Sequence, residues 1–364
     1  MTSARDLDGR RLIVCVGPGG VGKTTVSAAL ALQAAVAGRV VDVMTIDPAP
    51  RLLDALGLGE DAAEPHAVDL APLASGDAGT LRAMRLDPKA TFDEIVTRYA
   101  PTPAAAAAIL RGRIYQNLSN AMAGVADYMA MERVLALSRD GGADLIVLDT
   151  PPARAALDFL DAPRRMLELI GSRALTLLGA TRTAARGPFG LLDSAARAVL
   201  GLFDRFSGLH LLADVQEFVR SFDGMYEGFA SRAADAAALL HDRATAIVLV
   251  STTDEKRIAE IQEFAAVLDQ RGLRINAVIV NRAMPRLGDP SIIEQGDLPA
   301  ALAHKLRRCL ESYNVERARE SRALEQLRGT LPPATRILIA SDVGREPSSI
   351  RDLLAVADGL RVAD

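Results

Sequence analysis

The stretch that decides the fold is an octapeptide near the N-terminus, Gly17-Pro18-Gly19-Gly20-Val21-Gly22-Lys23-Thr24. It directly follows a short apolar run, Leu12–Val16, and opens an Ala- and Leu-rich segment, Thr24–Ala37. The pattern G-x-x-x-x-G-K-[ST] between a strand and a helix is typical of a phosphate-binding loop. Its glycines let backbone N–H groups approach phosphate oxygens, and the helix N-terminus adds positive potential. The octapeptide therefore predicts a nucleotide-binding loop.

Within this loop each residue type indicates a role. Lys23 would neutralise the β- and γ-phosphate oxygens, and the Thr24 hydroxyl would bind Mg²⁺. The remaining contacts are expected from Gly19, Gly20, Val21, Gly22 and Thr25. A glycine-rich turn without a ligand is the alternative, and it is disfavoured because a predicted strand and helix flank the motif as a phosphate-binding loop requires.

Further short apolar runs recur along the chain, each ending in a turn or a polar residue. They are Val40–Ile46, Leu81–Leu86, Leu145–Leu148, Ala246–Val250, Ile275–Val280 and Ile337–Ala340. Continuous apolar runs rich in Val and Ile are typical of strands buried on both faces, as in parallel sheets. Helical segments such as Asp254–Gln270 separate them. This alternation predicts an α/β fold with a doubly wound, mainly parallel sheet.

Two long gaps, about 88–142 and 153–243, interrupt the alternation, and both have helical patterns. Seven of the fourteen aromatic residues (nine Phe and five Tyr) lie between Phe189 and Phe229. We therefore expect a helical subdomain formed by insertions into a single domain, 1–364. Ordinary packing of these helices is favoured over a client-binding surface, which stays open as an alternative.

Composition narrows the class of protein. The 364 residues carry a formal charge of −4, which argues against a protein that binds nucleic acid by neutralising phosphates. Two isolated cysteines, Cys15 and Cys309, cannot form a zinc ribbon or a disulfide framework. No apolar run reaches the roughly 18 residues of a transmembrane helix, and the N-terminus lacks a secretory pattern. The cytoplasm is the expected location.

Polar residues follow three of the predicted strands. In parallel sheets the carboxyl ends of the strands line the ligand crevice. Asp47 would orient a water that attacks the γ-phosphate, or it would cap the turn at 51–56. Asp149 ends Leu145–Leu148 and would hold Mg²⁺ as a Walker-B-like carboxylate. Asn281 would read adenine through its amide.

Taken together and in order, these motifs resemble those of the ArsA-type ATPases, the family of the arsenite-pump and tail-anchored-protein targeting ATPases. That family belongs to the P-loop NTPases with a deviant Walker A motif, GKGGVGKTT, which is similar to GPGGVGKTT here. The matching segments span nearly the whole chain: Gly17–Thr25, Asp47–Gly57, Asp149–Pro163, Val248–Arg282 and Ile337–Leu354.

The resemblance implies binding of ATP or ADP with Mg²⁺, and ATP hydrolysis. It implies that Asp47 and Lys23 act in catalysis, that Thr24 and Asp149 serve Mg²⁺, and that Asn281 contacts the base. It also implies base contacts from a C-terminal loop, at Ser341, Asp342 and Val343. A homodimer, or a heterodimer with a paralogue, would supply two sites, and the helical insertions would hold a client, possibly a hydrophobic protein segment.

Departures from the family pattern concern the dimer and the client. The signature lysine of the deviant motif is replaced by Pro18, so turnover is expected to be low unless Arg51 or Arg154 supplies the charge. The zinc-binding CxxC and the arsenite cysteines are missing. A metal clasp, arsenite binding and an iron–sulfur cluster are therefore not expected.

Two other functions remain open. A ParA/MinD-like spatial organiser would need an amphipathic membrane helix or a basic DNA-binding face, and the predicted C-terminal helix, Ser348–Asp364, has too mixed a charge for a membrane anchor. A nucleotide-binding scaffold with little hydrolysis would be compatible with Pro18. The leading expectation is a dimeric switch that couples nucleotide state to a client, in which the apolar stretch Leu167–Leu212 takes part.

Overall fold

The computed structural model describes residues 9–59, 63–73, 78–112, 115, 123–170, 225–285, 287 and 298–363. The chain divides into two compact units. The first comprises Met1–Arg85, Asp140–Ala156 and His241–Asp364, and the second comprises Leu86–Arg139 and Leu157–Leu240. Each unit is described by itself. No described helix is long and apolar enough to cross a bilayer.

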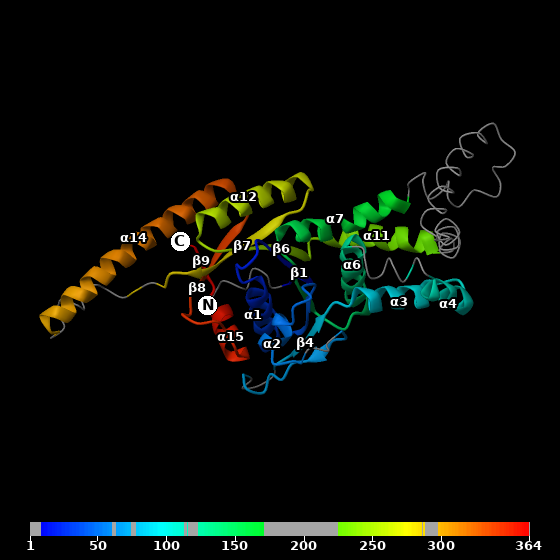
Figure 1. The fold of residues 1–364 in the computed structure, drawn as a ribbon, viewed down its shortest axis with the longest axis horizontal. Coiled ribbons are helices and arrows are strands. Elements are labelled where there is room, and N and C mark those ends of the chain that lie inside the picture. Colours follow the sequence, from blue (N-terminus) through cyan, green and yellow to red (C-terminus); the bar gives the residue numbers. More distant parts are fainter. Residues whose placement is uncertain are drawn as a thin grey trace, which may run out of the picture. The chain divides into compact units, whose positions relative to one another are not determined.

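The first unit is built on a nine-stranded sheet of order β3-β4-β2-β5-β1-β6-β7-β8-β9 (Figure 1). Its strands are β1 (Leu12–Val16), β2 (Val40–Thr45), β3 (His66–Ala67), β4 (Thr80–Arg85), β5 (Leu145–Asp149), β6 (Thr245–Ser251), β7 (Ile275–Ala283), β8 (Arg336–Ser341) and β9 (Arg361–Val362). All neighbours pair in parallel except the two short edge strands. The predicted α/β fold with a mainly parallel sheet is confirmed.

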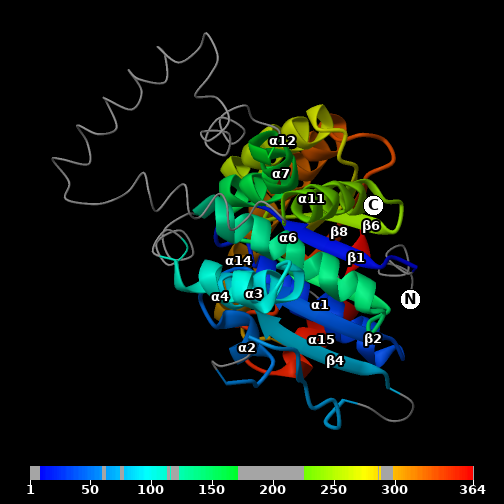
Figure 2. The ribbon, with the colours of Figure 1, turned by 90° about the vertical axis from the view of Figure 1, so that its right-hand side faces the viewer.

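The central strands are mostly apolar because both faces of the sheet are covered. Every residue of β1 and of β5 is buried. One face packs on α1 (Lys23–Val36) and α15 (Ile350–Asp358), and the other carries α12 (Glu255–Gln270), against which α14 (Ala300–Thr330) packs (Figures 1 and 2). Cys15 is fully buried in this core, and burial raises the pKa of its thiol to about 12. Cys15 therefore acts as a small apolar packing residue in this strand.

The C-terminal segment differs from its prediction as one helix over Ser348–Asp364. The helix α15 ends at Asp358, and Gly359 caps it. The chain then turns back, and Arg361 and Val362 pair antiparallel with β8. A strand of two residues leaves no periodic signal in the sequence. The helical pattern alone therefore predicts a helix that continues past its actual end at Asp358.

The second unit is helical among its described residues. Its helices are α3 (Pro88–Tyr99), α4 (Pro103–Arg111), α6 (Ala123–Asp140), α7 (Ala153–Ile170) and α11 (Tyr226–His241). The side chain of Asp87 accepts a hydrogen bond from the Ala90 amide, and Pro88 follows as the first helical residue, so α3 starts where its cap and proline place it. An aromatic cluster of Phe92, Tyr115, Tyr128 and Phe229 forms the core.

Residues 171–224 lie outside the described residues. They include five of the seven aromatics between Phe189 and Phe229 and most of the apolar stretch Leu167–Leu212, on which the client hypothesis rests. Helices do occupy the described parts of both expected insertions. The extent of the helical subdomain and the treatment of 1–364 as a single domain stay predictions.

Candidate functional site

The loop between β1 and α1 has a backbone that only glycine allows at two points. Gly22 has a φ of 88°, and a Cβ built on it would lie 2.2 Å from the Asn281 Nδ2. A Cβ on Gly17 would lie 2.2 Å from the carbonyl oxygen of Val250. The two glycines therefore let this loop lie against the ends of β6 and β7, above the centre of the sheet.

Lys23 begins α1 and is almost fully buried, with its Nζ donating a hydrogen bond to the Pro18 carbonyl at 2.8 Å. Burial lowers the pKa of this ammonium, while the carboxylates of Asp149 and Asp47 raise it. The lysine thus spans the loop, held close to two carboxylates.

The carboxylate of Asp149 connects the loop to two neighbouring strands. Its Oδ2 accepts hydrogen bonds from the Thr24 hydroxyl at 2.8 Å and from the Thr45 hydroxyl at 3.0 Å. Its buried Oδ1 has no hydrogen-bond partner among the described residues. Burial raises the pKa of Asp149 to about 6, although the two hydroxyls and the Lys23 ammonium lower it and Asp47 raises it further.

Asp47 lies just after β2, and its backbone N–H donates to the Thr45 hydroxyl at 3.2 Å. Its Oδ1 accepts from the Ala49 amide at 3.0 Å, so the side chain stabilises its own turn. The helix α2 (Arg51–Ala55) has Pro50 as its N-cap and no side-chain cap. Asp47 therefore does not cap that helix, and no hydrogen bond to its second oxygen occurs among the described residues.

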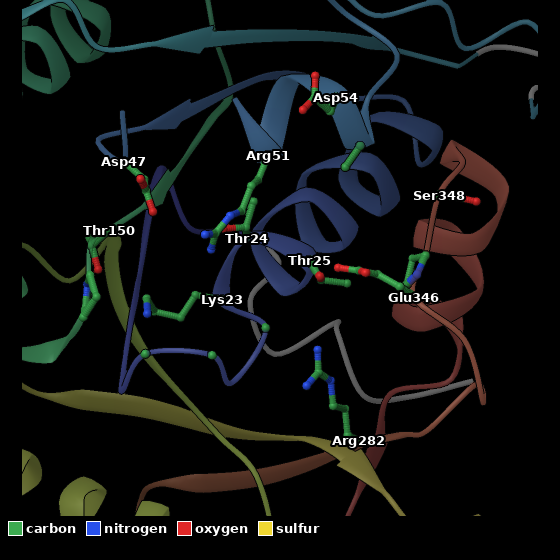
Figure 3. A pocket seen from close by; sticks show the side chains of 16 residues that line it. Lys23, Thr24, Thr25, Asp47, Arg51, Asp54, Thr150, Arg282, Glu346 and Ser348 are labelled. Atoms are coloured by element: carbon green, nitrogen blue, oxygen red, sulfur yellow. The ribbon is translucent and has the colours of Figure 1, made fainter. Parts of the chain in front are cut away.

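A cavity of about 430 Å³ lies over this loop. The loop residues Gly19, Gly20, Gly22, Lys23, Thr24 and Thr25 line it, together with Asp47, Arg51, Asp54, Thr150, Arg282 and Glu346. Figure 3 shows the guanidinium of Arg51 pointing from α2 toward Thr24, and that of Arg282 entering from the opposite side. Of the two arginines considered as replacements for the missing lysine, Arg51 reaches the cavity, and the Arg154 side chain is outside the described part.

A second cavity, of about 330 Å³, adjoins the first at shared residues. It brings together Asn281, Ser341, Asp342 and Val343, the predicted base contacts. The Asn281 Nδ2 donates to the Val21 carbonyl at 3.0 Å, so the amide also holds the loop. Thr25, Arg282, Glu346 and Pro347 line both cavities.

The residues present fit a magnesium nucleotide. A hydroxyl beside a carboxylate with a free oxygen is a hard oxygen donor set, which suits Mg²⁺. The described part of the chain has no group of three or more His, Cys, Asp or Glu that could hold a metal. An ion here would therefore take most of its ligands from phosphate oxygens and water.

Three residues of this site were not foreseen from the sequence. Thr45 lies within the expected strand Val40–Ile46 and carries no motif of its own, and its role depends on strand register, since it lies opposite Asp149. Glu346 lies in the matching segment Ile337–Leu354, but within that segment the resemblance implies contacts only from Ser341, Asp342 and Val343. Arg282 follows the predicted Asn281, so its position next to a candidate ligand was the one available signal.

A glycine-rich loop joining the central strand of a parallel sheet to a helix, with a strand-end carboxylate bonded to the loop threonine, defines a P-loop NTPase. Residues 10–294 match the family model of the anion-transporting ATPases, ArsA. The chain therefore belongs to the ArsA anion-transporting ATPase family.

The relatives of this chain match it over different shares of its length. An uncharacterized protein of Streptomyces coelicolor is 28% identical over 353 residues, which are 95% of this chain and 75% of that protein. The ATPase GET3 of Malassezia globosa is 31% identical over 153 residues, 42% of each chain. The ATPase GET3 of Podospora anserina is 30% identical over 165 residues, 45% of this chain and 46% of the relative. The matches span less than half the length of these GET3 proteins.

Proposed function

We propose that this protein binds ATP with Mg²⁺, hydrolyses it, and uses the nucleotide state as a switch in a dimer that binds or hands over a client. The observation that carries the proposal is the carboxylate of Asp149, which accepts a hydrogen bond from the Thr24 hydroxyl and keeps a second, buried oxygen without a partner among the described residues. Thr24 itself lines the cavity over the phosphate-binding loop. Membership in a family of ATPases supports it.

In this proposal the loop backbone from Gly19 to Thr25 and the Lys23 ammonium hold the phosphates. The chemistry that Mg²⁺ supplies when bound is neutralisation of charge on the β- and γ-phosphate oxygens. Thr24 and Asp149 hold the ion, and the hydrogen bond already present between them sets their spacing. Asn281 and the loop at 341–343 accommodate the base.

Asp47 orients the attacking water with its second oxygen, because Ala49 already occupies the first. Thr45 links this residue to Asp149 through one hydroxyl. Loss of the γ-phosphate would therefore change the loops at Asp47 and Asp149 together, and this coupling is the basis of the switch.

The dimer, the client and the location belong to the proposal as well. A second copy, or a paralogue, would face the site across the loop carrying Pro18. A hydrophobic protein segment is the client that the apolar sequence at 167–212 suggests. We place the protein in the cytoplasm and treat 1–364 as one functional domain.

Phosphate release from ATP tests the enzymatic part. We compare the wild type with Lys23→Ala and Asp47→Asn, each matched to an exposed residue of the same charge, Lys305→Ala and Asp269→Asn. We expect Lys23→Ala to lose nucleotide binding, and Asp47→Asn to keep binding but lose turnover. Equal phosphate release in all five proteins would remove the claim of hydrolysis.

A scaffold that binds nucleotide without hydrolysis is the second candidate, favoured by Pro18. It predicts nucleotide binding that depends on Lys23 together with no turnover in the wild type. For the client, Asp47→Asn loaded with ATP serves as bait, and the same protein loaded with ADP serves as control. Identical sets of captured proteins in the two states would contradict a nucleotide-controlled client.

A further inference from the structure

Arg282 has a backbone conformation that arginine rarely adopts. Its φ is 57°, and among the described residues it is the one non-glycine with a positive φ. The left-handed region costs an ordinary side chain free energy, and such strain gathers at functional sites. It coincides with a shift in register between β7 and β8, from Val280 to Ala283. The strained residue thus lies where the strand leaves regular pairing.

The side chain of Arg282 points into the proposed nucleotide site. Figure 3 shows the guanidinium of Arg282 pointing from the end of β7 into the cavity. Arg282 lines the cavity over the phosphate-binding loop and also the adjoining cavity of Asn281. No hydrogen bond or ion pair of this guanidinium occurs within the described part of the chain. An exposed, unpaired cation is thus positioned where the two cavities meet.

The proposed nucleotide binding, on which this inference rests, indicates which group of the nucleotide lies at this position. In the proposed function the phosphates lie over Lys23 and Thr24, and the base lies beside Asn281. The part of the nucleotide between them, the sugar and the first phosphate, then lies beside the residues that line both cavities. Thr25 and Arg282 are two of these. The group at that point is the phosphate attached to the sugar.

We propose that Arg282 is a nucleotide-binding residue whose guanidinium holds the α-phosphate. The planar guanidinium can donate two parallel hydrogen bonds to the oxygens of one phosphate, whereas a lysine ammonium acts as a point charge. The α-phosphate is common to ATP and ADP, so this contact contributes equally to both. Arg282 thus secures the nucleotide in both states of the switch, while the residues around Asp47 distinguish them.

Glu346 flanks the same junction from the loop before α15, and Figure 3 shows its carboxylate directed toward Thr25. A carboxylate repels a phosphate, so Glu346 does not share the role of Arg282. It is the anionic group that would compete for the guanidinium. Glu346→Gln should therefore leave the loss caused by Arg282→Ala unchanged.

The experiment measures affinities for ADP and for the non-hydrolysable ATP analogue AMP-PNP, both with Mg²⁺, by titration calorimetry. The variants are Arg282→Ala and Arg282→Gly, each alone and combined with Glu346→Gln, and the single variant Glu346→Gln is the reference for the combined ones. Arg274→Ala is the matched control, because Arg274 is exposed and precedes the opposite end of the same strand, β7. Thermal unfolding without nucleotide is measured for every protein.

We expect both substitutions of Arg282 to weaken ADP and AMP-PNP by the same factor, about tenfold, as loss of one charge-assisted hydrogen bond predicts. We expect Arg282→Gly to unfold about 1–3 °C higher than Arg282→Ala, since only glycine relieves the strain. Arg274→Ala should change neither affinity.

Three results would overturn the inference: unchanged affinities, a loss confined to AMP-PNP, or a loss that disappears with Glu346→Gln. The first would leave Arg282 without a ligand contact, the second would move its contact to the γ-phosphate, and the third would make it act through Glu346. A wild type that binds neither nucleotide would instead refute the proposed function, and this inference with it.

Discussion

The hydroxyl of Thr45 donates a hydrogen bond to the Asp149 Oδ2 at 3.0 Å, and it accepts one from the Asp47 backbone N–H at 3.2 Å. One buried hydroxyl therefore joins the turn after β2 to the carboxylate at the end of β5. Because a hydroxyl can donate and accept at once, threonine can connect these two segments in a way that an apolar residue of the same shape cannot.

Thr45→Val tests this connection. We expect the free energy of unfolding to fall by about 1–3 kcal/mol, because the variant removes a hydrogen-bond donor from the buried Asp149 carboxylate and the acceptor of the half-buried Asp47 amide. ATP turnover should fall about tenfold while ADP affinity stays within about twofold, since the loop that holds the phosphates is intact. Thr45→Ser keeps the hydroxyl and serves as the control. Wild-type turnover in Thr45→Val would show that the two segments are not coupled through it.

Among the described residues, Arg51 is a cation placed to compensate for Pro18, because its guanidinium points toward Thr24 from α2. We expect Arg51→Ala to lower kcat for ATP hydrolysis about ten- to hundredfold, which is less than an arginine finger contributes because Arg51 is exposed. Arg51→Lys should have an intermediate rate. Adding Pro18→Lys to Arg51→Ala should restore part of the loss. If Arg51→Ala hydrolyses ATP like the wild type, the missing charge comes from elsewhere.

The seven longer strands of the sheet and part of the site could be predicted from the sequence, because their signals are local. The strands leading to Gly17 and to Asp149 are continuous apolar runs, and the glycine-rich loop carries its own spacing. Thr24 and Asp149 could be expected to meet because the carboxyl ends of parallel strands share one edge. The edge strands β3 and β9 could not be predicted, because two residues of strand have no periodicity.

What escaped prediction depends on pairing between distant segments. Thr45 matters because β2 and β5 align it opposite Asp149. Arg282 matters because the register of β7 and β8 shifts beside it. Register and bulges are set by the packing of the whole sheet, and a single sequence does not encode them in any short window.

Asp127 should make stability depend on pH. The pKa of this carboxyl is raised to about 6, mainly by burial and also by the nearby Asp158, while Arg165 lowers it. Its ionised form is thus disfavoured in the fold, and stability falls as pH rises from about 4 through 6. Because Asp127 is half-exposed, solvent reduces this penalty to about 1 kcal/mol or less.

Asp127→Asn removes the group that titrates. We expect the variant to be more stable than the wild type at pH 7.5, and the advantage to vanish near pH 4, where Asp127 is protonated. The measurement is urea unfolding followed by circular dichroism at several pH values. Asp140→Asn, at the exposed end of α6, is the control for loss of one negative charge. A constant difference between pH 4 and 7.5 would contradict the assignment to Asp127.

The helices α6 and α11 are joined by one buried and one exposed ion pair, which allows a matched comparison. Arg232 Nε lies 3.1 Å from both Glu132 oxygens, and its guanidinium stacks 4.0 Å from the Tyr99 ring centroid. The exposed pair is Arg139 with Asp235.

Glu132→Gln and Asp235→Asn each remove one carboxylate charge from these two pairs. We expect Glu132→Gln to cost about 3–5 kcal/mol, because it leaves the Arg232 charge buried without a counterion. Asp235→Asn should cost less than about 1 kcal/mol, because water screens the exposed pair. Urea unfolding followed by circular dichroism at pH 7.5 measures both. Equal losses would mean that water compensates for the lost carboxylate as well at the buried pair as at the exposed one. Glu132 would then not stabilise the helical unit more than Asp235 does.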